Sequence, residues 1–242
     1  MHSSNSSLKI SFIIAAAGSG KRMNLEKPKQ FLKFNGEPLI YYSIAEAEKI
    51  NFVSEIIIST NKEYLNFLKN YCKEKKFKKN IKIVEGSVER QYSIANALKE
   101  VSGDIEYVAI HDAARPFLKQ KYFEQAIQEL KNYDGVVVGV KSRDTVKIIN
   151  DKNEIIKTLN RDEIILANTP QFFKKNVILK AYEKAKEEKF LGTDDSSLVE
   201  RIGGKIKFIE GDKDNIKITF KEDLKFFQEE LWLKYTILWQ IN

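Results

Sequence analysis

Short apolar runs alternate with longer amphipathic segments along most of this chain. The apolar runs predict strands at 10–16, 54–59, 81–84, 105–110 and 135–140, with another near 205–210. The segments with helical spacing predict helices at 38–49, 62–74, 88–101, 119–132, 175–188, 195–203 and 221–237. Repeated strand–helix units predict an α/β fold with a mainly parallel sheet covered on both faces. Ligands of such sheets bind at the carboxyl ends of the strands, so we look first at the loops after residues 16, 84, 110 and 140.

The composition limits the kinds of site that the chain can carry. Its 242 residues, 43% of them hydrophobic, suffice for one globular domain, which we place at 1–242. One cysteine, Cys72, excludes an internal disulfide framework and a multi-cysteine zinc site, and with only two histidines we expect no histidine-built metal centre. No apolar run approaches the ~20 residues that a membrane-spanning helix needs. We therefore expect a cytoplasmic protein without a membrane partner.

The net charge of +7 favours an anionic partner. Nucleic acid, nucleotides and sugar phosphates all satisfy that sign. The basic segment 73–82 contributes much of the excess charge, but no aromatic-rich strip or nucleic-acid-binding motif accompanies it. Such a run is typical of a solvated helix end and loop, so we expect no nucleic-acid partner.

Two strand-like segments after residue 140 interrupt the strand–helix alternation. They cover 143–150 and 154–160 and flank the sequence DKN at 151–153, which is typical of a β-hairpin closed by an Asn/Asp turn. An isolated hairpin is marginally stable in water. This arm, at about 142–160, therefore either packs on a second subunit or lies on its own domain, and the sequence favours neither.

The first predicted strand runs into a loop at 15–23 in which two glycines precede two cations, namely Gly18, Gly20, Lys21 and Arg22. Backbone N–H groups of such a loop can approach a phosphate closely. The loop lacks the Ser or Thr that a P-loop needs after its lysine, and Met23 stands where a dinucleotide loop needs Gly or Ala. Lys29 follows within a few residues. Three cations beside one glycine loop suit a triphosphate, because they would otherwise repel one another.

Further short stretches follow this loop in order along the chain. They are EGSVERQYSI (85–94), HDAARPF (111–117), RDTVK (143–147), TPQFF (169–173) after Arg161, TDDSSLVE (193–200) and DNIKIT (214–219). Together with the glycine loop and the KPKQF segment at 27–31, they resemble the 2-C-methyl-D-erythritol 4-phosphate cytidylyltransferase family. The resemblance covers residues 10 to about 230, and it depends on the ordered combination, since each stretch alone is a weak signal.

The resemblance implies a Rossmann-like sheet of nucleotidyltransferase type that works as a homodimer through the hairpin arm. The implied reaction joins CTP to 2-C-methyl-D-erythritol 4-phosphate and releases pyrophosphate, with Mg²⁺ bound mainly on the CTP phosphates and no metal site built by the protein. The implied CTP-binding residues are Ala16, Ala17, Gly18, Gly20, Lys21, Gly86, Ser87, Arg90, Ser93 and Asp112. Around the polyol phosphate it implies Asp112, Arg115, Thr145, Arg161, Thr169, Thr193 and Lys217. The implied catalytic cations are Arg22, Lys29, Arg161 and Lys217.

The residue types fit this chemistry independently. The nucleophile is already a phosphate anion, so the reaction needs no general base, and Arg and Lys side chains can position the anions and stabilise the charge that develops. We therefore expect His111 to be a hydrogen-bonded residue at a strand end. Asp112 could contact a metal ion, a hydroxyl group or neighbouring amides. Lys217 is expected in a strand.

Three positions depart from the family pattern: Asn168, Glu85 and Tyr92 stand where Gln, Gly and Asp are usual. Ribitol-5-phosphate cytidylyltransferases share several of the stretches, but TVK at 145–147 and TDDSSLVE at 193–200 favour the methylerythritol branch. A nucleotide-binding sensor without catalysis is the third alternative. The presence of Lys29, Arg161 and Lys217 argues against it.

Overall fold

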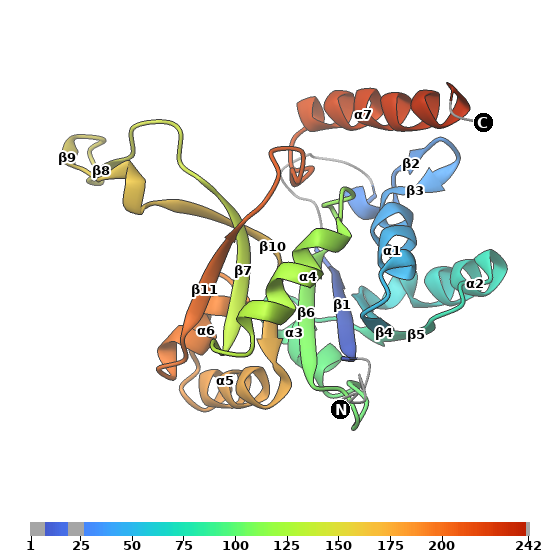
Figure 1. Cartoon of the computed structure of the whole chain (residues 1–242), viewed down its shortest axis with the longest axis horizontal. Coiled ribbons are helices and arrows are strands. Elements are labelled where there is room, and N and C mark those ends of the chain that lie inside the picture. Colours follow the sequence, from blue (N-terminus) through green and yellow to red (C-terminus); the bar gives the residue numbers. More distant parts are fainter. Residues whose placement is uncertain (1–7, 19–26, 241–242) are drawn as a thin grey trace, which may run out of the picture.

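A seven-stranded sheet organises the chain, of which the computed structural model describes residues 8–18 and 27–240, with side chains up to residue 231. The strand order is β11-β7-β10-β6-β1-β4-β5 (Figure 1). The bounds are β1 Ile10–Ala16, β4 Val53–Thr60, β5 Asn80–Glu85, β6 Tyr107–Asp112, β7 Gly135–Lys141, β10 Ile165–Lys174 and β11 Ile206–Glu210. Every neighbouring pair is parallel except the two that β10 makes with β6 and β7. The predicted α/β fold with a mainly parallel sheet is confirmed.

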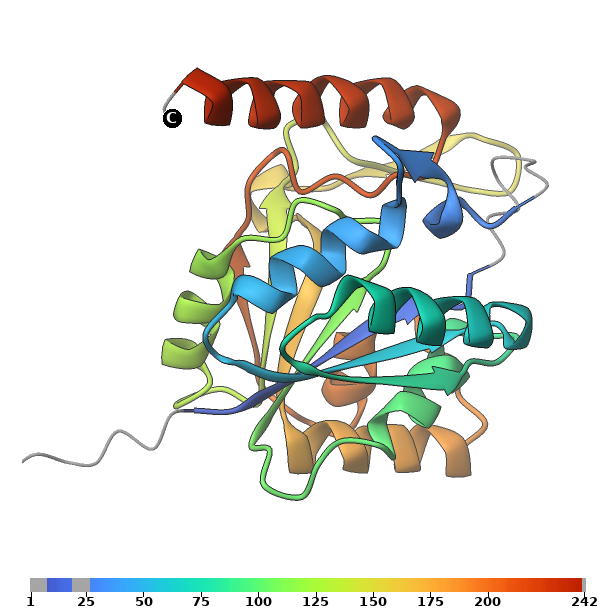
Figure 2. The same ribbon diagram turned by 90° about the vertical axis from the view of Figure 1, so that its right-hand side faces the viewer.

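Helices cover both faces of this sheet (Figure 2). One face carries α1 (Leu39–Lys49), α2 (Leu65–Lys75) and α4 (Gln120–Glu129), and the other carries α3 (Arg90–Leu98), α5 (Lys175–Glu187) and α6 (Asp195–Arg201). Alternate residues of β1 point to opposite faces of the sheet: Phe12 and Ile14 pack with the first set of helices, and Ile13 packs with the second. A strand buried on both faces needs an unbroken apolar run of this kind.

The apolar pattern does not predict β10, the one antiparallel strand of the sheet. Its residues 165–167 pair with β7, and residues 171–173 pair with both β6 and β7. The ladder is interrupted between Ala167 and Gln171, and Pro170 lies in that interruption. Proline has no N–H group to donate to a ladder, which is why this residue argues against a central strand in the sequence and is tolerated in the structure.

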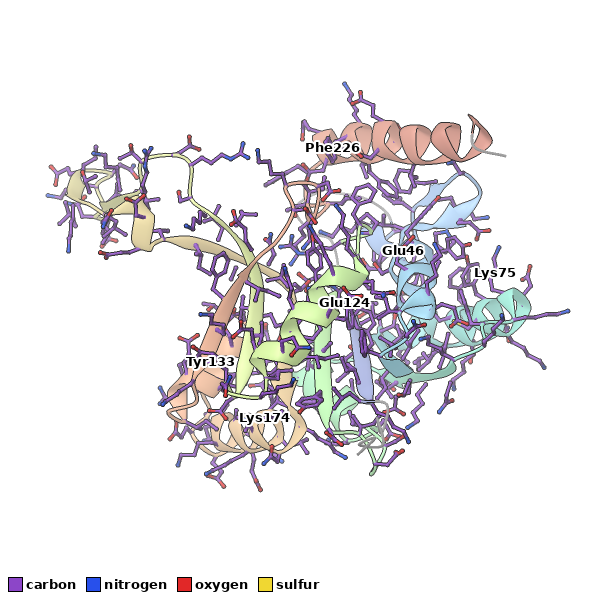
Figure 3. All side chains as sticks on the ribbon, viewed as in Figure 1. Glu46, Lys75, Glu124, Tyr133, Lys174 and Phe226 are labelled. Carbon is purple, nitrogen blue, oxygen red and sulfur yellow. The ribbon has the colours of Figure 1, made fainter. Side chains whose placement is uncertain are left out.

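The predicted hairpin arm is present but has shorter strands, β8 Lys147–Ile149 and β9 Ile155–Thr158. The Asn150 side chain closes the turn, because its Oδ1 accepts hydrogen bonds from the backbone N–H groups of Lys152 and Glu154 at 3.0 and 2.9 Å. The arm projects away from the sheet, with its side chains extending around the ribbon (Figures 1 and 3). Four isoleucines on it are 43–64% exposed: Ile148, Ile149, Ile155 and Ile156. Of the two alternatives, packing on its own domain is therefore wrong.

The carboxyl-terminal helix α7 (Lys221–Gln240) lies across α1 and the small hairpin β2–β3 (Lys33–Phe34 and Glu37–Pro38) (Figure 1). Phe227 packs edge-on against Phe34 and Tyr42 in a separate apolar cluster. The segment before α7 is a loop, so the expected strand around Lys217 is wrong. Loop partners satisfy its backbone instead: Ile218 donates to the Ala114 carbonyl at 2.9 Å. None of the helices in the described part of the chain is long and apolar enough to cross a membrane.

Candidate active site

A cavity of about 300 Å³ lies beyond the carboxyl ends of β1 and β6. The loops after β1, β5 and β6 contribute to it, as the sequence predicts, and so does the loop before α7. Its lining consists of Ala15, Ala17, Gly18, Lys29, Gln30, Ser87, Val88, Arg90, Ser93, Asp112, Ala113, Ala114, Lys217 and Thr219. We call it the first cavity.

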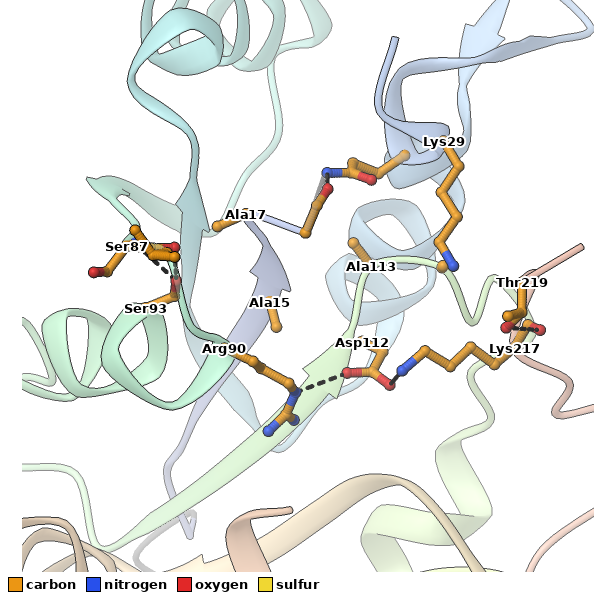
Figure 4. A pocket seen from close by; sticks show the side chains of 14 residues that line it. Ala15, Ala17, Lys29, Ser87, Arg90, Ser93, Asp112, Ala113, Lys217 and Thr219 are labelled. Atoms are coloured by element: carbon orange, nitrogen blue, oxygen red, sulfur yellow. Dashed lines mark hydrogen bonds and ion pairs between the residues drawn. The ribbon is translucent and has the colours of Figure 1, made fainter. Parts of the chain in front are cut away.

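Cationic side chains flank the carboxylate of Asp112 on both sides in this cavity (Figure 4). Arg90 Nε donates to its Oδ1 at 3.1 Å, and Lys217 Nζ lies 2.6 Å from its Oδ2. Arg115 Nε lies 3.9 Å from Oδ2. Burial alone would raise the pKa of Asp112, but Arg90, Lys217 and Arg115 hold that pKa well below its usual range. The carboxylate is therefore ionised near pH 7.

The loops after β1 and β5 come close together on the opposite side of the first cavity. The backbone N–H of Gly86 donates to the Thr60 carbonyl at 2.7 Å, and the Ser87 N–H donates to Ser93 Oγ at 2.8 Å. A Cβ atom on Gly86 would lie 2.5 Å from Ala17 Cβ and 3.0 Å from Ser93 Oγ. Only glycine allows this approach, so position 86 determines how backbone groups line this wall.

Gln30 is a site residue that the sequence analysis missed. It lies in a 3₁₀ turn, Lys29–Phe31, and is buried. Its Nε2 donates to the carbonyl oxygens of Ala16 and Gly18 at 2.6 and 2.8 Å, and thereby ties the turn to the start of the glycine loop. The neighbouring Phe31 ring stacks on Tyr64 with 3.9 Å between ring centroids. The KPKQF stretch contains this glutamine, but nothing in the sequence indicates that it is buried.

A second cavity of about 1100 Å³ adjoins the first at Lys217. It lies between the end of β7, the base of the arm and the loop 210–217, and its lining includes Arg115, Arg143 and Asn168. Arg115 is buried, and its Nη1 donates to the Asn215 carbonyl at 2.7 Å. Its Nε has no hydrogen-bond partner in the described part of the chain. The guanidinium of Arg115 nevertheless lines the second cavity, and a guanidinium in that position is suited to bind an anion.

His111 and Thr169 lie beneath the two cavities. Thr169 Oγ1 accepts the Asp112 N–H at 3.0 Å and lies 3.1 Å from His111 Nδ1, while His111 Nε2 lies 2.8 Å from the Arg115 carbonyl oxygen. Burial lowers the pKa of His111 to about 4, so the imidazole is neutral near pH 7. The expectation of a hydrogen-bonded histidine at a strand end is confirmed, and that it takes no part in catalysis stays a prediction. Thr169 supports the Asp112 backbone, and direct substrate contact by its hydroxyl stays a prediction.

The structure brings most, but not all, of the predicted site residues together. The first cavity contains Ala17, Gly18, Lys29, Ser87, Arg90, Ser93, Asp112 and Lys217, and Ala16 and Gly86 lie directly beside its lining. Arg115 lies in the second cavity. Three further predicted residues are exposed to solvent and line neither cavity: Thr145, Arg161 and Thr193. Gly20, Lys21 and Arg22 lie outside the described residues.

Comparisons with known proteins find sequence and structural similarity along nearly the whole chain. A family model described as 2-C-methyl-D-erythritol 4-phosphate cytidylyltransferase matches residues 10–231. A protein of that name from Fusobacterium nucleatum is 53% identical over 232 residues, which cover 94% of this chain and 100% of the relative. Another from Caldanaerobacter subterraneus is 44% identical over 218 residues, covering 90% and 96% of the two chains. The crystal structure of 4-diphosphocytidyl-2C-methyl-D-erythritol synthase from Anaerococcus prevotii superimposes with a TM-score of 0.82 at 34% identity, covering 93% and 99%.

Proposed function

The chain belongs to the 2-C-methyl-D-erythritol 4-phosphate cytidylyltransferase family, and we propose that its two adjoining cavities each receive one of the two substrates. The enzyme transfers CMP from CTP to 2-C-methyl-D-erythritol 4-phosphate in isoprenoid biosynthesis, and pyrophosphate leaves. The observation that carries the proposed division is the position of Lys217, which lines both cavities. We assign CTP to the first cavity and the polyol phosphate to the second.

CTP fits the first cavity with its base between the loops after β1 and β5. The backbone groups beside Ala17, Gly86 and Ser87 can contact the edge of the cytosine. The triphosphate then extends along the glycine loop towards Lys29, whose side chain points into the cavity (Figure 4). Gly20, Lys21 and Arg22 follow in the same loop, and their contact with the phosphates stays a prediction.

The polyol phosphate fits the second cavity, whose lining includes the cations Arg115, Arg143 and Lys217. Its phosphate oxygen attacks the α-phosphorus of CTP, the new P–O bond forms, and the bond to the β-phosphate oxygen breaks. The attacking group is already an anion, so no side chain has to remove a proton from it. Arg115 and Lys217 offset the repulsion between the two substrates, and Lys217 stabilises the charge that develops on the α-phosphate.

We propose Mg²⁺ as the cofactor, held mainly by the CTP phosphates. In the described part of the chain no three His, Cys, Asp or Glu side chains come together as a metal site. Among the described residues that line the first cavity, Asp112 is the one carboxylate. This donor set fits Mg²⁺, which commonly uses one or two carboxylates together with substrate phosphates and waters. When bound, the ion would neutralise phosphate charge, and Asp112 is the side chain placed to hold it.

We propose that the arm joins two copies of the chain into a homodimer. Its four exposed isoleucines leave apolar surface without cover, which a second subunit would bury. Thr145 lies on this arm and Arg161 directly follows it, and neither lines a cavity of its own chain. In a homodimer they would be able to reach the second cavity of the other subunit, which explains why substrate residues are expected on a projecting element.

A pyrophosphate-release assay tests the transfer. We expect turnover with CTP, Mg²⁺ and 2-C-methyl-D-erythritol 4-phosphate, and only slow turnover when ATP or GTP replaces CTP. Equal rates with ribitol 5-phosphate would move the enzyme to the other branch. Absence of turnover with either polyol would favour a sensor.

Mixed dimers test whether the site is shared between subunits. Arg161→Ala and Lys217→Ala homodimers should both be almost inactive. When the two variants are co-expressed, about half of the dimers are mixed, and each mixed dimer has one doubly damaged and one intact site. Activity should therefore return to about a quarter of the wild-type value. A preparation in which mixed dimers are verified and activity does not return would contradict the shared site without affecting the assigned reaction.

A further inference from the structure

Asp195 is a buried carboxylate that lines neither cavity, yet it is linked to the first one. It is 1% exposed and lies in the first turn of α6. Its Oδ1 and Oδ2 accept hydrogen bonds from Arg90 Nη1 and Nη2 at 3.0 and 2.7 Å, a bidentate pair. Tyr182 on α5 donates its hydroxyl proton to Oδ1 at 2.5 Å. Burial of an ionised carboxylate is costly unless it is paired and hydrogen-bonded, and here both conditions are met.

Arg90 connects this carboxylate to the one in the cavity. Its two Nη atoms face Asp195, whereas its Nε donates to Asp112 Oδ1. Asp112 Oδ2 in turn accepts from Lys217. A continuous series of polar contacts therefore runs from Tyr182 through Asp195, Arg90 and Asp112 to Lys217, and it joins α5, α6, α3, β6 and the loop before α7.

The inner end of this series is held rigidly. Asp194 is the N-cap of α6 and accepts the Ser197 N–H at 2.9 Å. Gln171 of β10 contacts both Asp194 and the Ser196 N–H, at 2.8 and 3.0 Å. The Tyr182 ring belongs to the apolar cluster under the sheet. Asp195 therefore has a fixed position relative to the sheet, and a planar guanidinium bound to it by two hydrogen bonds has a fixed orientation.

We propose that Asp195, supported by Tyr182, is a positioning residue that orients Arg90, so that Arg90 fixes the Asp112 carboxylate and, through it, the resting position of Lys217. The proposal rests on the cytidylyl transfer assigned above and extends it by two residues that do not contact substrate. It also changes the role of Arg90. The predicted CTP contact would have to use the N–H groups that remain after three of its five donors have bound carboxylates.

A double-mutant cycle separates positioning from general destabilisation. Asp195→Asn keeps the side-chain shape but faces the Arg90 N–H groups with an amide donor. We expect kcat/KM to fall about 10- to 100-fold in an otherwise wild-type enzyme, because displacement of a catalytic constellation by about 1 Å has effects of this size. The same substitution in an Asp112→Asn background should cause little further loss, because the residue through which it acts has already been changed.

Glu55→Gln is the matched control. Glu55 is also a buried carboxylate paired with a cation, since its Oε2 lies 2.8 Å from Lys82 Nζ, but it lies near the start of β4 and lines neither cavity. It should lower the melting temperature and leave kcat/KM of the folded enzyme unchanged in both backgrounds. Tyr182→Phe removes only the hydroxyl group and should give a loss of about 2- to 10-fold, which keeps the proposal testable if Asp195→Asn does not fold. A Tyr182→Phe enzyme with wild-type kcat/KM, or equal losses from Asp195→Asn in both backgrounds, would overturn the proposal.

A crystal structure of the Asp195→Asn protein tests the position of Arg90 independently of any activity measurement. Tyr182→Phe takes its place if Asp195→Asn does not fold. We expect Arg90 Nε to move out of hydrogen-bond reach of Asp112 Oδ1 in Asp195→Asn, and the Arg90–Asp112 geometry to shift in Tyr182→Phe. In Glu55→Gln the contact should persist. If Arg90 and Asp112 keep the wild-type geometry, the proposal is wrong. Failure of the assigned reaction would instead appear as absence of turnover by the wild-type enzyme, which this structural comparison does not depend on.

Discussion

A single added methyl group at Gly86 should open one wall of the first cavity, to which we assign CTP. A Cβ at this position would lie 2.5 Å from Ala17 Cβ, 3.0 Å from Ser93 Oγ and 3.3 Å from the Thr60 carbonyl oxygen. Carbon atoms pack at about 3.5–4.0 Å, so the loops after β1 and β5 would have to separate by about 1 Å. Overpacking of this kind costs about 1–3 kcal/mol, which corresponds to a melting temperature lower by about 2–12 °C in a chain of this size.

Gly86→Ala should lower the catalytic efficiency as well as the stability. If the two loops hold the cytosine, a displacement of about 1 Å should lower kcat/KM for CTP about 10- to 100-fold, measured as initial rates of pyrophosphate release at varied CTP. Gly103→Ala is the control, because no atom lies within 4 Å of a Cβ at that position, and it should behave as wild type. A Gly86→Ala enzyme with an unchanged melting temperature and a kcat/KM for CTP within twofold of wild type would refute the assignment of this wall to the nucleotide.

Three further predictions follow from individual contacts. Lys29→Ala should lower the rate by about 10²–10³ with little change in melting temperature, because it removes a donor to phosphate; a large loss of stability with full activity of the folded fraction would contradict this. Burial lowers the pKa of His111 from 6.5 to about 4, so below pH 6.5 the unfolded chain binds a proton that the folded chain excludes. This contribution, ~3 kcal/mol, should be complete above pH 6.5 and disappear as the pH falls to 4. Urea titrations should show a shallower pH dependence over that range for His111→Gln, and an identical slope would disprove the argument. Gln30→Leu should raise KM for CTP, because it removes the hydrogen bonds to the carbonyls of Ala16 and Gly18. It should lower the melting temperature only slightly, since the Phe31–Tyr64 stack remains. An unchanged KM would show that these two hydrogen bonds are dispensable.

The apolar pattern predicts the parallel part of the fold because buried parallel strands are continuous apolar runs. It does not predict β10, in which Pro170 and the polar Asn168 and Thr169 interrupt the run at the point where the ladder is interrupted too. It also misplaces Lys217 in a strand, because IKIT at 216–219 alternates like a strand although its backbone bonds to the loop after β6. Pattern arguments of this kind find elements that pair regularly and fail where tertiary contacts replace the ladder.

The site was predictable where a residue type by itself indicates its chemistry. Lysines beside a glycine loop indicate phosphate, and the ordered stretches singled out Asp112, Arg115 and Lys217, which line the two cavities. Gln30 and Asp195 were missed because their roles depend on partners far away in the sequence: Gln30 on backbone carbonyls 12 and 14 residues before it, and Asp195 on an arginine 105 residues before it. A glutamine such as Gln30, or an aspartate such as Asp195 that follows another aspartate, does not indicate a site by its residue type. Its role becomes visible only when the fold brings its hydrogen-bond partner close.

The two carboxylates of the Arg90 network explain how a site for two anions can fold without them. Arg90, Arg115 and Lys217 converge on Asp112, and three cations this close would repel one another strongly in a partly buried site. Asp112 and Asp195 together offset two of the three charges and leave a net charge of about +1. The pairing thus limits the repulsion, and we expect the remaining positive charge to attract a substrate phosphate. If the proposed network is correct, a substrate phosphate should replace Asp112 as the partner of Lys217, whereas Asp195 should keep Arg90 in place. The second carboxylate thereby allows one cation of the network to move while the other stays in place.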